Sequence, residues 1–225
     1  MADLHVMLAK LPKTILVTGF APFGGEKINP SWQIVKALPD MMLGCRVEKL
    51  LVPTEFGQSI TVVTSAIDKL KPALILCLGQ AGSRAAMSIE RIAINVNDAS
   101  IADNAGAQPV DTAIVKHAPA AYFCTLPLKA MMTAITTAGV PAEISNTAGT
   151  FVCNHLIYGV LHHLAIHQSA SRAGFMHVPF LESQILNRAD TAALSLAAMV
   201  EGTKAAIIAA IQNHINIKTV GGKLH

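Results

Sequence analysis

The stretch Ala73-Leu74-Ile75-Leu76-Cys77-Leu78-Gly79-Gln80-Ala81-Gly82 decides the fold class of this chain. Its first six residues are apolar without alternation, which is typical of a central parallel strand that is covered on both faces. The glycine-containing run that follows indicates a loop at the end of this strand. Such a strand needs helices on both sides of its sheet, so the stretch favours an α/β fold.

Outward from this stretch, short apolar β-type runs alternate with helical patterns. The alternation predicts a largely parallel, twisted sheet with helices on both faces, a three-layer αβα sandwich. Strands are expected at residues 14–18, 46–52, 73–78, 92–96, 142–145 and 173–178. Helices are expected from a cap at Asn29 with Pro30 in the first turn, and at residues 56–70, 127–138, 152–166 and 188–215, the last as one long helix or two.

Composition places limits on domain number and on function. The 225 residues are 52% apolar and 14% charged, which suits a large core and a buried subunit interface. No break in composition divides the chain, so we expect a single catalytic domain over residues 1–225, with flexible ends at 1–12 and 216–225. The net charge is +3 without a basic cluster, so nucleic-acid binding has little support.

Location is indicated by what the sequence lacks. No run reaches the roughly 18 apolar residues of a membrane span, and the N-terminus has no signal-peptide pattern. The four cysteines lie far apart without a Cys-x-x-Cys pair, which argues against a zinc site or a disulfide framework and favours a reducing cytoplasm. Cys45, Cys77 and Cys124 are interpreted as small core residues.

Cys153 differs from the other cysteines in its surroundings. It stands in Ser145-Asn146-Thr147-Ala148-Gly149-Thr150-Phe151-Val152-Cys153-Asn154-His155, where a loop of small residues runs into a helical pattern. The start of a helix favours negative charge, so a thiol there is well placed to become a thiolate. His177 follows at the end of an apolar strand pattern, and a cysteine near a histidine can perform nucleophilic acyl transfer.

Four loops that follow predicted strands should meet at one edge of the sheet, where sites form in α/β folds. They are residues 19–25, residues 79–82, the loop before Cys153 and the turn at Pro179. Residues 97–118 form a long polar excursion between elements, and long loops of this kind are often functional.

Residues 19–25 are rich in glycine but do not match a phosphate loop. No Lys-Ser or Lys-Thr pair follows Gly24 or Gly25, and the Gly-x-Gly-x-x-Gly pattern fails. The loop carries Phe20 and Phe23 instead. Their rings suit a flat, neutral ligand, although packing of both rings into the core explains them equally well.

Glu90 also has two interpretations. It is either a surface carboxylate paired with Arg91, or the carboxylate that accepts the second ring N–H of a catalytic histidine and fixes its tautomer. His163 and His167 are four residues apart without the intervening glutamate of a metalloprotease helix, so metal binding is not favoured.

Several long motifs in register resemble the bacterial pyrrolidone-carboxylate peptidases, also called pyroglutamyl peptidase I, a cysteine peptidase family. The resemblance covers about residues 14–184 and rests on the motifs at 19–25 with 29–32, 79–82, 88–91, 147–155 and 177–179. It implies a phosphorylase- or hydrolase-like α/β domain that removes N-terminal pyroglutamate from peptides. It also implies a cytoplasmic, commonly tetrameric enzyme with a reduced thiol, no cofactor and no metal.

The resemblance assigns roles to individual residues. Cys153 is the expected nucleophile, His177 the general base and acid, and Glu90 the group that orients His177. The expected pocket for the lactam ring consists of Phe20, Phe23, Thr54, Phe151 and Val152, with Gln80 as a polar partner.

Two positions depart from the family pattern. Ser100 stands where bacterial members commonly have an arginine near the oxyanion, and Glu182-Ser183 replaces an expected Pro-Glu. We still expect activity, either with lower turnover or with compensation by Arg91 or another donor. Two alternatives remain: a homologue that binds pyroglutamyl groups without turnover, and a nucleoside phosphorylase-like transferase that uses residues 19–25 for phosphate.

Overall fold

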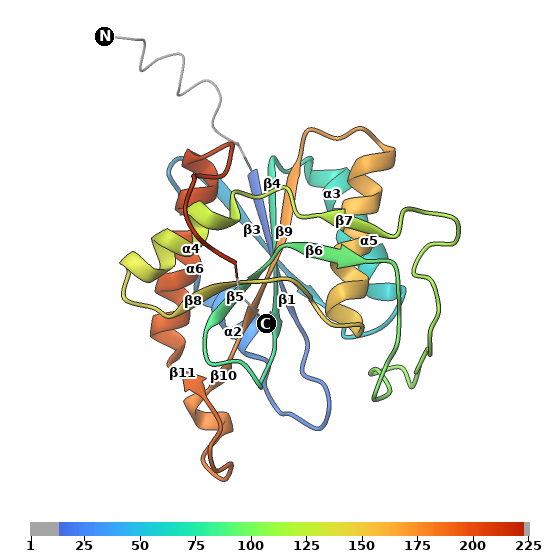
Figure 1. Cartoon of the computed structure of the whole chain (residues 1–225), viewed down its shortest axis with the longest axis horizontal. Coiled ribbons are helices and arrows are strands. Elements are labelled where there is room, and N and C mark those ends of the chain that lie inside the picture. The colour runs from blue at the N-terminus through green and yellow to red at the C-terminus, as the bar shows by residue number, and fades with distance from the viewer. Residues whose placement is uncertain (1–13, 223–225) are drawn as a thin grey trace.

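A seven-stranded sheet forms the middle layer of the molecule (Figure 1), in the order β2-β3-β1-β4-β9-β5-β8. The computed structural model describes residues 14–222. Only the pairs β2–β3 and β5–β9 are antiparallel within this sheet, so the prediction of a mostly parallel sheet is confirmed. Its strands are β1 (Thr14–Phe20), β2 (Met41–Met42), β3 (Cys45–Val52), β4 (Leu74–Gln80), β5 (Met87–Glu90), β8 (Ala142–Ser145) and β9 (Arg172–Val178).

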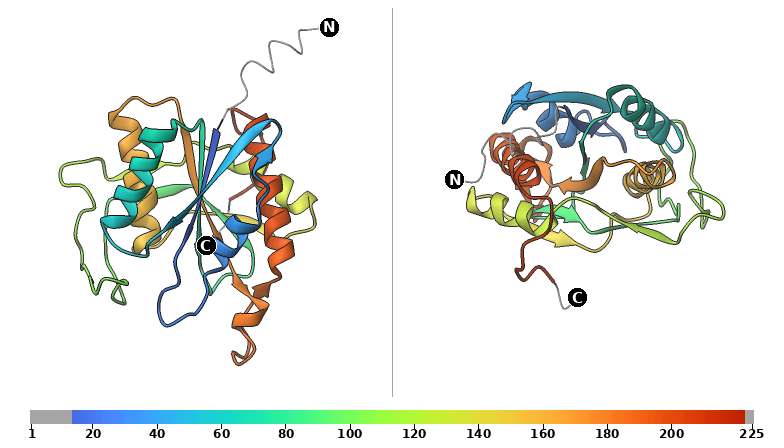
Figure 2. Two further views of the ribbon diagram at one scale, coloured as in Figure 1. Left: turned by 180° about the vertical axis from the view of Figure 1, so that it is seen from behind. Right: turned by 90° about the horizontal axis from the view of Figure 1, so that it is seen from above.

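Helices cover both faces of the sheet, as predicted (Figure 2). One face carries α2 (Pro30–Ala37), α4 (Leu128–Thr137) and α6 (Leu196–Gln212), and the other carries α3 (Gln58–Leu70) and α5 (Val152–Ile166). Each face has its own cluster of buried apolar side chains. Asn29 caps α2 by accepting a hydrogen bond from Ser31 N at 3.1 Å, and Pro30 is its first residue, as the sequence indicates.

Strand β4 is the centre of the sheet, and all seven of its residues are buried. It pairs with β1 on one side and with β9 on the other. Its alternate side chains enter the two apolar clusters, with Leu74 and Leu76 on one face and Ile75 and Cys77 on the other. This explains the uninterrupted apolar run, because neither face of the strand meets water.

Two small sheets and one long loop complete the described chain. Strand β6 (Ile92–Ile94) pairs with β7 (Ala121–Phe123), and β10 (Phe180–Leu181) pairs with β11 (Ala193–Leu194). The excursion at 97–118 contains no helix or strand and is closed by a bridge between Asn97 and Thr112. A short 3₁₀ helix spans Glu182–Gln184.

One helix prediction is wrong at its start, and several short strands were not predicted. The helix expected over 188–215 begins only at Leu196, because Ala193–Leu194 pairs with β10 and Ser195 caps α6 by accepting from Ala198 N at 3.2 Å. Strand β5 was not expected. It is buried at all four positions, and four residues are too few to show the alternation of apolar and polar side chains that identifies a strand.

The chain ends are partly described. The flexible end predicted at 1–12 lies outside the described residues, as do residues 223–225. Residues 216–222 have no regular structure but contact the body, since Asn216 Oδ1 accepts from Lys129 N at 3.0 Å and Gly221 O accepts from Arg91 at 3.4 Å. Within residues 14–222, the helices are too short or too polar for any of them to cross a membrane.

Candidate active site

The carboxyl ends of β1, β4 and β9 meet at one edge of the sheet, the lower edge in Figure 1. Hydrogen bonds join the loops there. Ala81 N donates to Val178 O at 2.9 Å, and Ala21 N donates to Val52 O at 2.9 Å. The excursion reaches the same edge, because Asn104 donates to Pro22 O at 2.9 Å. The predicted convergence is therefore present for the loops after β1, β4 and β9. The loop before Cys153 departs from the prediction, because it follows β8, which is parallel to β5 and so runs opposite to β9.

Cys153 lies against the central strand at this edge. It is the second residue of α5, whose cap residue Phe151 is preceded by a turn with Gly149 at φ 76°. A Cβ on Gly79 would lie 2.8 Å from Cys153 Sγ, so the sulfur sits directly over this glycine. Gly79 is the register partner of His177 on β9. The sulfur is therefore next to the strand position that carries the predicted histidine.

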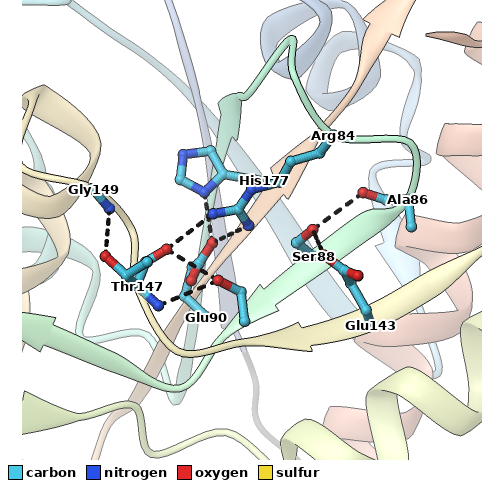
Figure 3. Close-up of polar contacts among 9 residues, drawn as sticks. Arg84, Ala86, Ser88, Glu90, Glu143, Thr147, Gly149 and His177 are labelled. Carbon is cyan, nitrogen blue, oxygen red and sulfur yellow. Dashed lines mark hydrogen bonds and ion pairs between the residues drawn. The ribbon is translucent and has the colours of Figure 1, made fainter. Parts of the chain in front are cut away.

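His177 and Glu90 form a buried pair (Figure 3). His177 Nδ1 lies 2.7 Å from Glu90 Oε1, and the side chains are 4% and 0% exposed. A carboxylate only accepts hydrogen bonds, so Nδ1 carries the proton and Nε2 is left as the acceptor. The Phe175 ring, 4.8 Å from the imidazole centroid, packs against it. The pair thus has the geometry that orients a histidine as a base.

Glu90 has a second partner that the sequence prediction missed. Arg84 Nη1 lies 2.5 Å from Glu90 Oε1, and Arg84 Nη2 donates to Thr147 O at 2.9 Å. The interpretation of Glu90 as a surface residue paired with Arg91 is wrong. Arg91 donates instead to Asn146 Oδ1 at 2.8 Å, because neighbouring positions along a strand point to opposite faces. The sequence feature that could have identified Arg84 is its position as a lone cation in the loop after β4.

Burial controls the ionisation of the thiol and the imidazole. Burial, together with the negative charge of Glu90, raises the pKa of Cys153 to about 12, while Arg84 opposes this rise. Burial also lowers the pKa of His177, against the opposing effect of Glu90. At neutral pH the resting groups are therefore a thiol and a neutral imidazole. The sequence indicates a thiol that is well placed to become a thiolate, but the cost of burying the charge exceeds the effect of the helix start.

A cavity of about 560 Å³ opens beside the end of β4. Two of the predicted pocket residues, Phe23 and Gln80, line it together with Ile101 and Phe180. Phe151 lies next to Phe23, with 6.0 Å between ring centroids. An aromatic and polar cavity of this kind fits a small, flat ligand.

Three other predicted pocket residues, Phe20, Thr54 and Val152, are buried and do not line this cavity. Phe20 is 2% exposed and packs on Phe175 at 6.4 Å between centroids. The Thr54 hydroxyl donates to Ala21 O at 2.9 Å, and Val152 is fully buried. Of the two rings in the glycine-rich loop, Phe20 thus packs in the core while Phe23 borders the cavity.

The sequence prediction also missed Phe56, Asp103 and His155. Phe56 makes a T-shaped contact with Phe151, 5.4 Å between centroids. Asp103 accepts from Phe56 N at 2.7 Å, and His155 Nε2 accepts from Gly57 N at 2.8 Å. These contacts fix the aromatic wall to the excursion. Ser100 is exposed in the same excursion.

The glycines of residues 19–25 are explained without phosphate. A Cβ on Gly19 would lie 2.8 Å from the backbone of Ser31 and Trp32, so this glycine lets α2 pack closely on β1. Gly24 and Gly25 have φ of 60° and 80°, which the turn requires. Within residues 14–222, no three His, Cys, Asp or Glu side chains form a group that could hold a metal ion.

Known proteins resemble this chain over most of its length. The sequence profile of the pyroglutamyl peptidase family matches residues 13–213. A pyrrolidone-carboxylate peptidase of Cupriavidus taiwanensis is 50% identical over 94% of this chain and 99% of the relative. The crystal structure of pyroglutamyl peptidase I from Bacillus amyloliquefaciens has a TM-score of 0.90 and 43% identity, covering 92% of this chain and 99% of that one. A mutant pyrrolidone carboxyl peptidase from Pyrococcus furiosus has a TM-score of 0.85 and 40% identity, covering 88% and 98%.

Proposed function

The chain belongs to the pyroglutamyl peptidase family, and we propose that it is a cysteine peptidase that removes pyroglutamate from the N-terminus of peptides. One observation carries this proposal: the buried His177–Glu90 pair stands beside the glycine on which Cys153 Sγ rests. That arrangement supplies a nucleophile, a base and an orienting carboxylate. The proposed activity is the one named for the relatives.

The first step is attack on the carbonyl that joins pyroglutamate to the next residue. His177 Nε2 takes the thiol proton as Cys153 Sγ bonds to the carbonyl carbon, so no free thiolate is needed beforehand. The imidazolium that forms is stabilised by Glu90, 2.7 Å from its other nitrogen. The C–N bond then breaks as His177 gives the proton to the leaving amine, and a thioester to Cys153 remains.

The oxyanion of this step is assigned to the start of α5. Phe151 provides no side-chain cap for the helix, so the first N–H groups of α5, those of Val152 and Cys153, can donate to a substrate oxygen. Removing one such donor typically costs ~3 kcal/mol of transition-state stabilisation. With these backbone donors, the oxyanion can be stabilised although Ser100 stands where the family commonly has an arginine.

Hydrolysis of the thioester completes the cycle. His177, neutral again, takes a proton from water, and the hydroxyl bonds to the carbonyl carbon. The C–S bond breaks, the proton returns to the sulfur, and pyroglutamate leaves as a free acid. The thiol and the neutral imidazole are restored.

The lactam ring is proposed to lie among Phe23, Phe151 and Gln80, with Phe20, Thr54 and Val152 as the supporting wall. Of the residues that line the cavity, Phe23 provides an apolar ring and Gln80 provides an amide. A site that hydrogen-bonds a lactam rejects analogues that lack it, because its buried polar groups are then left unpaired. A prolyl amide, which lacks the lactam carbonyl, should therefore be a poor substrate.

Three broader properties belong to the same proposal. One domain carries the whole activity, since the loops after β1, β4 and β9 meet at one edge and Cys153 lies over Gly79 at that edge. The enzyme works in the cytoplasm, where its four free cysteines stay reduced. It assembles as a tetramer, in keeping with its 52% apolar composition. Light scattering on a size-exclusion column should give four times the chain mass, and a monomer would contradict the assembly.

The activity is tested with a pyroglutamyl chromogenic amide and the reduced, folded protein. Release of the amine should be fast for the unaltered chain, absent for Cys153→Ala and independent of added phosphate. A prolyl amide serves as the comparison substrate, which lacks the lactam carbonyl and carries a basic amine in place of the lactam nitrogen. Failure of the folded protein to release the amine, or equal release by Cys153→Ala, would contradict the proposal.

A further inference from the structure

We propose that Arg84 is a positioning residue for this reaction: it joins the carboxylate that orients His177 to the loop that leads into Cys153. The inference rests on the proposed function. Arg84 Nη1 lies 2.5 Å from Glu90 Oε1, and Arg84 Nη2 donates to Thr147 O at 2.9 Å. Figure 3 shows its guanidinium between Glu90 and Thr147. One rigid group thus contacts both halves of the site.

The first contact supplies charge balance. Glu90 is 0% exposed, and a buried carboxylate is stable as an anion only with a counter-charge. His177 does not provide that charge in the resting state, because burial lowers its pKa and keeps it neutral. Arg84 provides it instead. Glu90 therefore stays negative and can stabilise the imidazolium when it forms.

The second contact fixes the approach to the nucleophile. Thr147 O also accepts from Ser145 Oγ at 3.0 Å, and Thr147 Oγ1 accepts from Gly149 N at 3.0 Å. These bonds form a compact loop immediately before the cap residue Phe151. By holding Thr147 O, Arg84 sets the position of this loop relative to Glu90.

The loop that carries Arg84 is itself held on its outer side. Arg84 N donates to Ala81 O at 3.1 Å. The Phe180 ring occupies the space where a side chain on Gly82 would be. The Arg188 guanidinium lies over that ring, 4.6 Å from its centroid. Arg84 is therefore anchored from β10 and is not a freely moving surface arginine.

Arg91 provides a matched control. It also bonds to the loop before Cys153, through Asn146 Oδ1 at 2.8 Å, but its described hydrogen bonds do not include Glu90. Replacement of Arg91 therefore measures the cost of loosening the loop. Replacement of Arg84 measures that cost together with the loss of the positive charge that balances Glu90.

The experiment compares Arg84→Met, Arg84→Lys and Arg91→Met with the unaltered chain on a pyroglutamyl chromogenic amide. For Arg84→Met we expect kcat to fall about 100-fold or more while KM changes less than about threefold, because an unpaired buried charge is costly. Arg84→Lys should recover part of kcat, since it keeps the charge but loses the two-pronged geometry. Arg91→Met should stay within about threefold.

The pH dependence separates this role from a merely structural one. The charge of Arg84 lowers the pKa of Cys153 and also lowers the pKa of His177. Its removal raises both, so both limbs of the kcat/KM profile should move to higher pH in Arg84→Met. Inactivation by iodoacetamide should shift in the same direction. A loosened loop alone, as in Arg91→Met, should lower the profile without moving its limbs.

A double variant closes the test. If Arg84 acts through Glu90, then Arg84→Met adds little to the loss caused by Glu90→Gln. Additive losses, unshifted limbs, or an equal loss in Arg91→Met would overturn the inference. If Arg84→Met fails to fold by circular dichroism, the limbs and the iodoacetamide profile of a second neutral variant, Arg84→Gln, decide. An inactive unaltered chain would instead overturn the proposed function.

Discussion

At the scale of single residues, the groups of the site together control where the thiol proton of Cys153 resides. Glu90 Oε1 accepts from both His177 and Arg84, and Cys153 sits over the neighbouring Gly79. The negative charge of Glu90 opposes ionisation of the resting thiol and favours the imidazolium. Burial, reinforced by this charge, therefore keeps the thiol protonated until the proton can pass to His177.

Glu90→Gln tests the orienting role. An amide in place of the carboxylate can hold the wrong tautomer of His177, so kcat should fall by about 10³- to 10⁴-fold with the fold intact. Circular dichroism and amide release measure the two effects. Glu143→Gln, on the adjoining strand β8, is the control and should keep most of the activity. A Glu90→Gln enzyme as fast as the unaltered chain would rule out the orienting role.

The pH dependence follows from the direction of the His177 shift. His177 must be neutral to accept the thiol proton, and burial lowers its pKa below the usual value of 6.5. The imidazole therefore stays neutral at pH 6.5 and becomes charged only at lower pH. In a kcat/KM profile, the acid limb should have its midpoint below 6.5. A midpoint above 6.5 would mean that Glu90 outweighs burial.

The sequence predicted the identity of the reacting groups better than their charges. Cys153 and His177 follow recognisable strand and helix patterns, so their place at one edge could be derived. The contact between Glu90 and Arg84 could not be predicted from the sequence, because it depends on β5 turning back beside β9. The protonation state of Cys153 could not be predicted either, since burial is a property of the folded chain.

At the scale of elements, long patterns were predicted well and short ones poorly. Helix α5 spans 152–166 as expected, and β4 lies at the centre as its apolar run indicates. Strand β5 has four residues and β11 has two, which is too few for a period to be read. The apolar run at 188–215 suggested one long helix or two, but tertiary pairing of β11 with β10 replaces the first part of it.

Gly79→Ala tests how closely α5 and β4 pack at the site. The new Cβ would lie 2.6 Å from Phe175 Cζ and 2.8 Å from Cys153 Sγ. We expect kcat to fall by more than tenfold and the free energy of unfolding to fall by ~1–3 kcal/mol. Amide release and urea unfolding measure both.

Gly159→Ala is the control on the same helix. Its Cβ would press on Ile60 of α3, away from Cys153, so stability should fall while kcat is kept. If Gly79→Ala loses no more activity than Gly159→Ala, the sulfur does not depend on the bare backbone at Gly79.

At the scale of the whole molecule, His155 ties three segments together. Its Nε2 accepts from Gly57 N at 2.8 Å, before α3, and its Nδ1 lies 2.9 Å from Asn97 Oδ1 in the excursion. Burial lowers its pKa to about 4, so the folded chain holds it neutral. Nε2 must remain an acceptor for this link to persist.

Acid should therefore weaken the fold through His155. Between pH 6.5 and 4 the unfolded chain binds a proton at His155 that the folded chain does not. The free energy of unfolding therefore decreases by up to about 3 kcal/mol as the pH is lowered through this range. Urea unfolding at pH 7.5 and pH 4.5 should show a smaller acid loss in His155→Gln than in the unaltered chain. Equal losses in the two proteins would contradict this role.

The central claim is that Cys153 is acylated by the pyroglutamyl group, and acid quenching during turnover tests it most directly. Mass spectrometry of the quenched, digested protein should find one pyroglutamyl group on the peptide that contains Cys153. Hydroxylamine should remove the group, as expected for a thioester, and Cys153→Ala should not acquire it. A pyroglutamyl group on another residue, or amine release that continues in Cys153→Ala, would contradict the account.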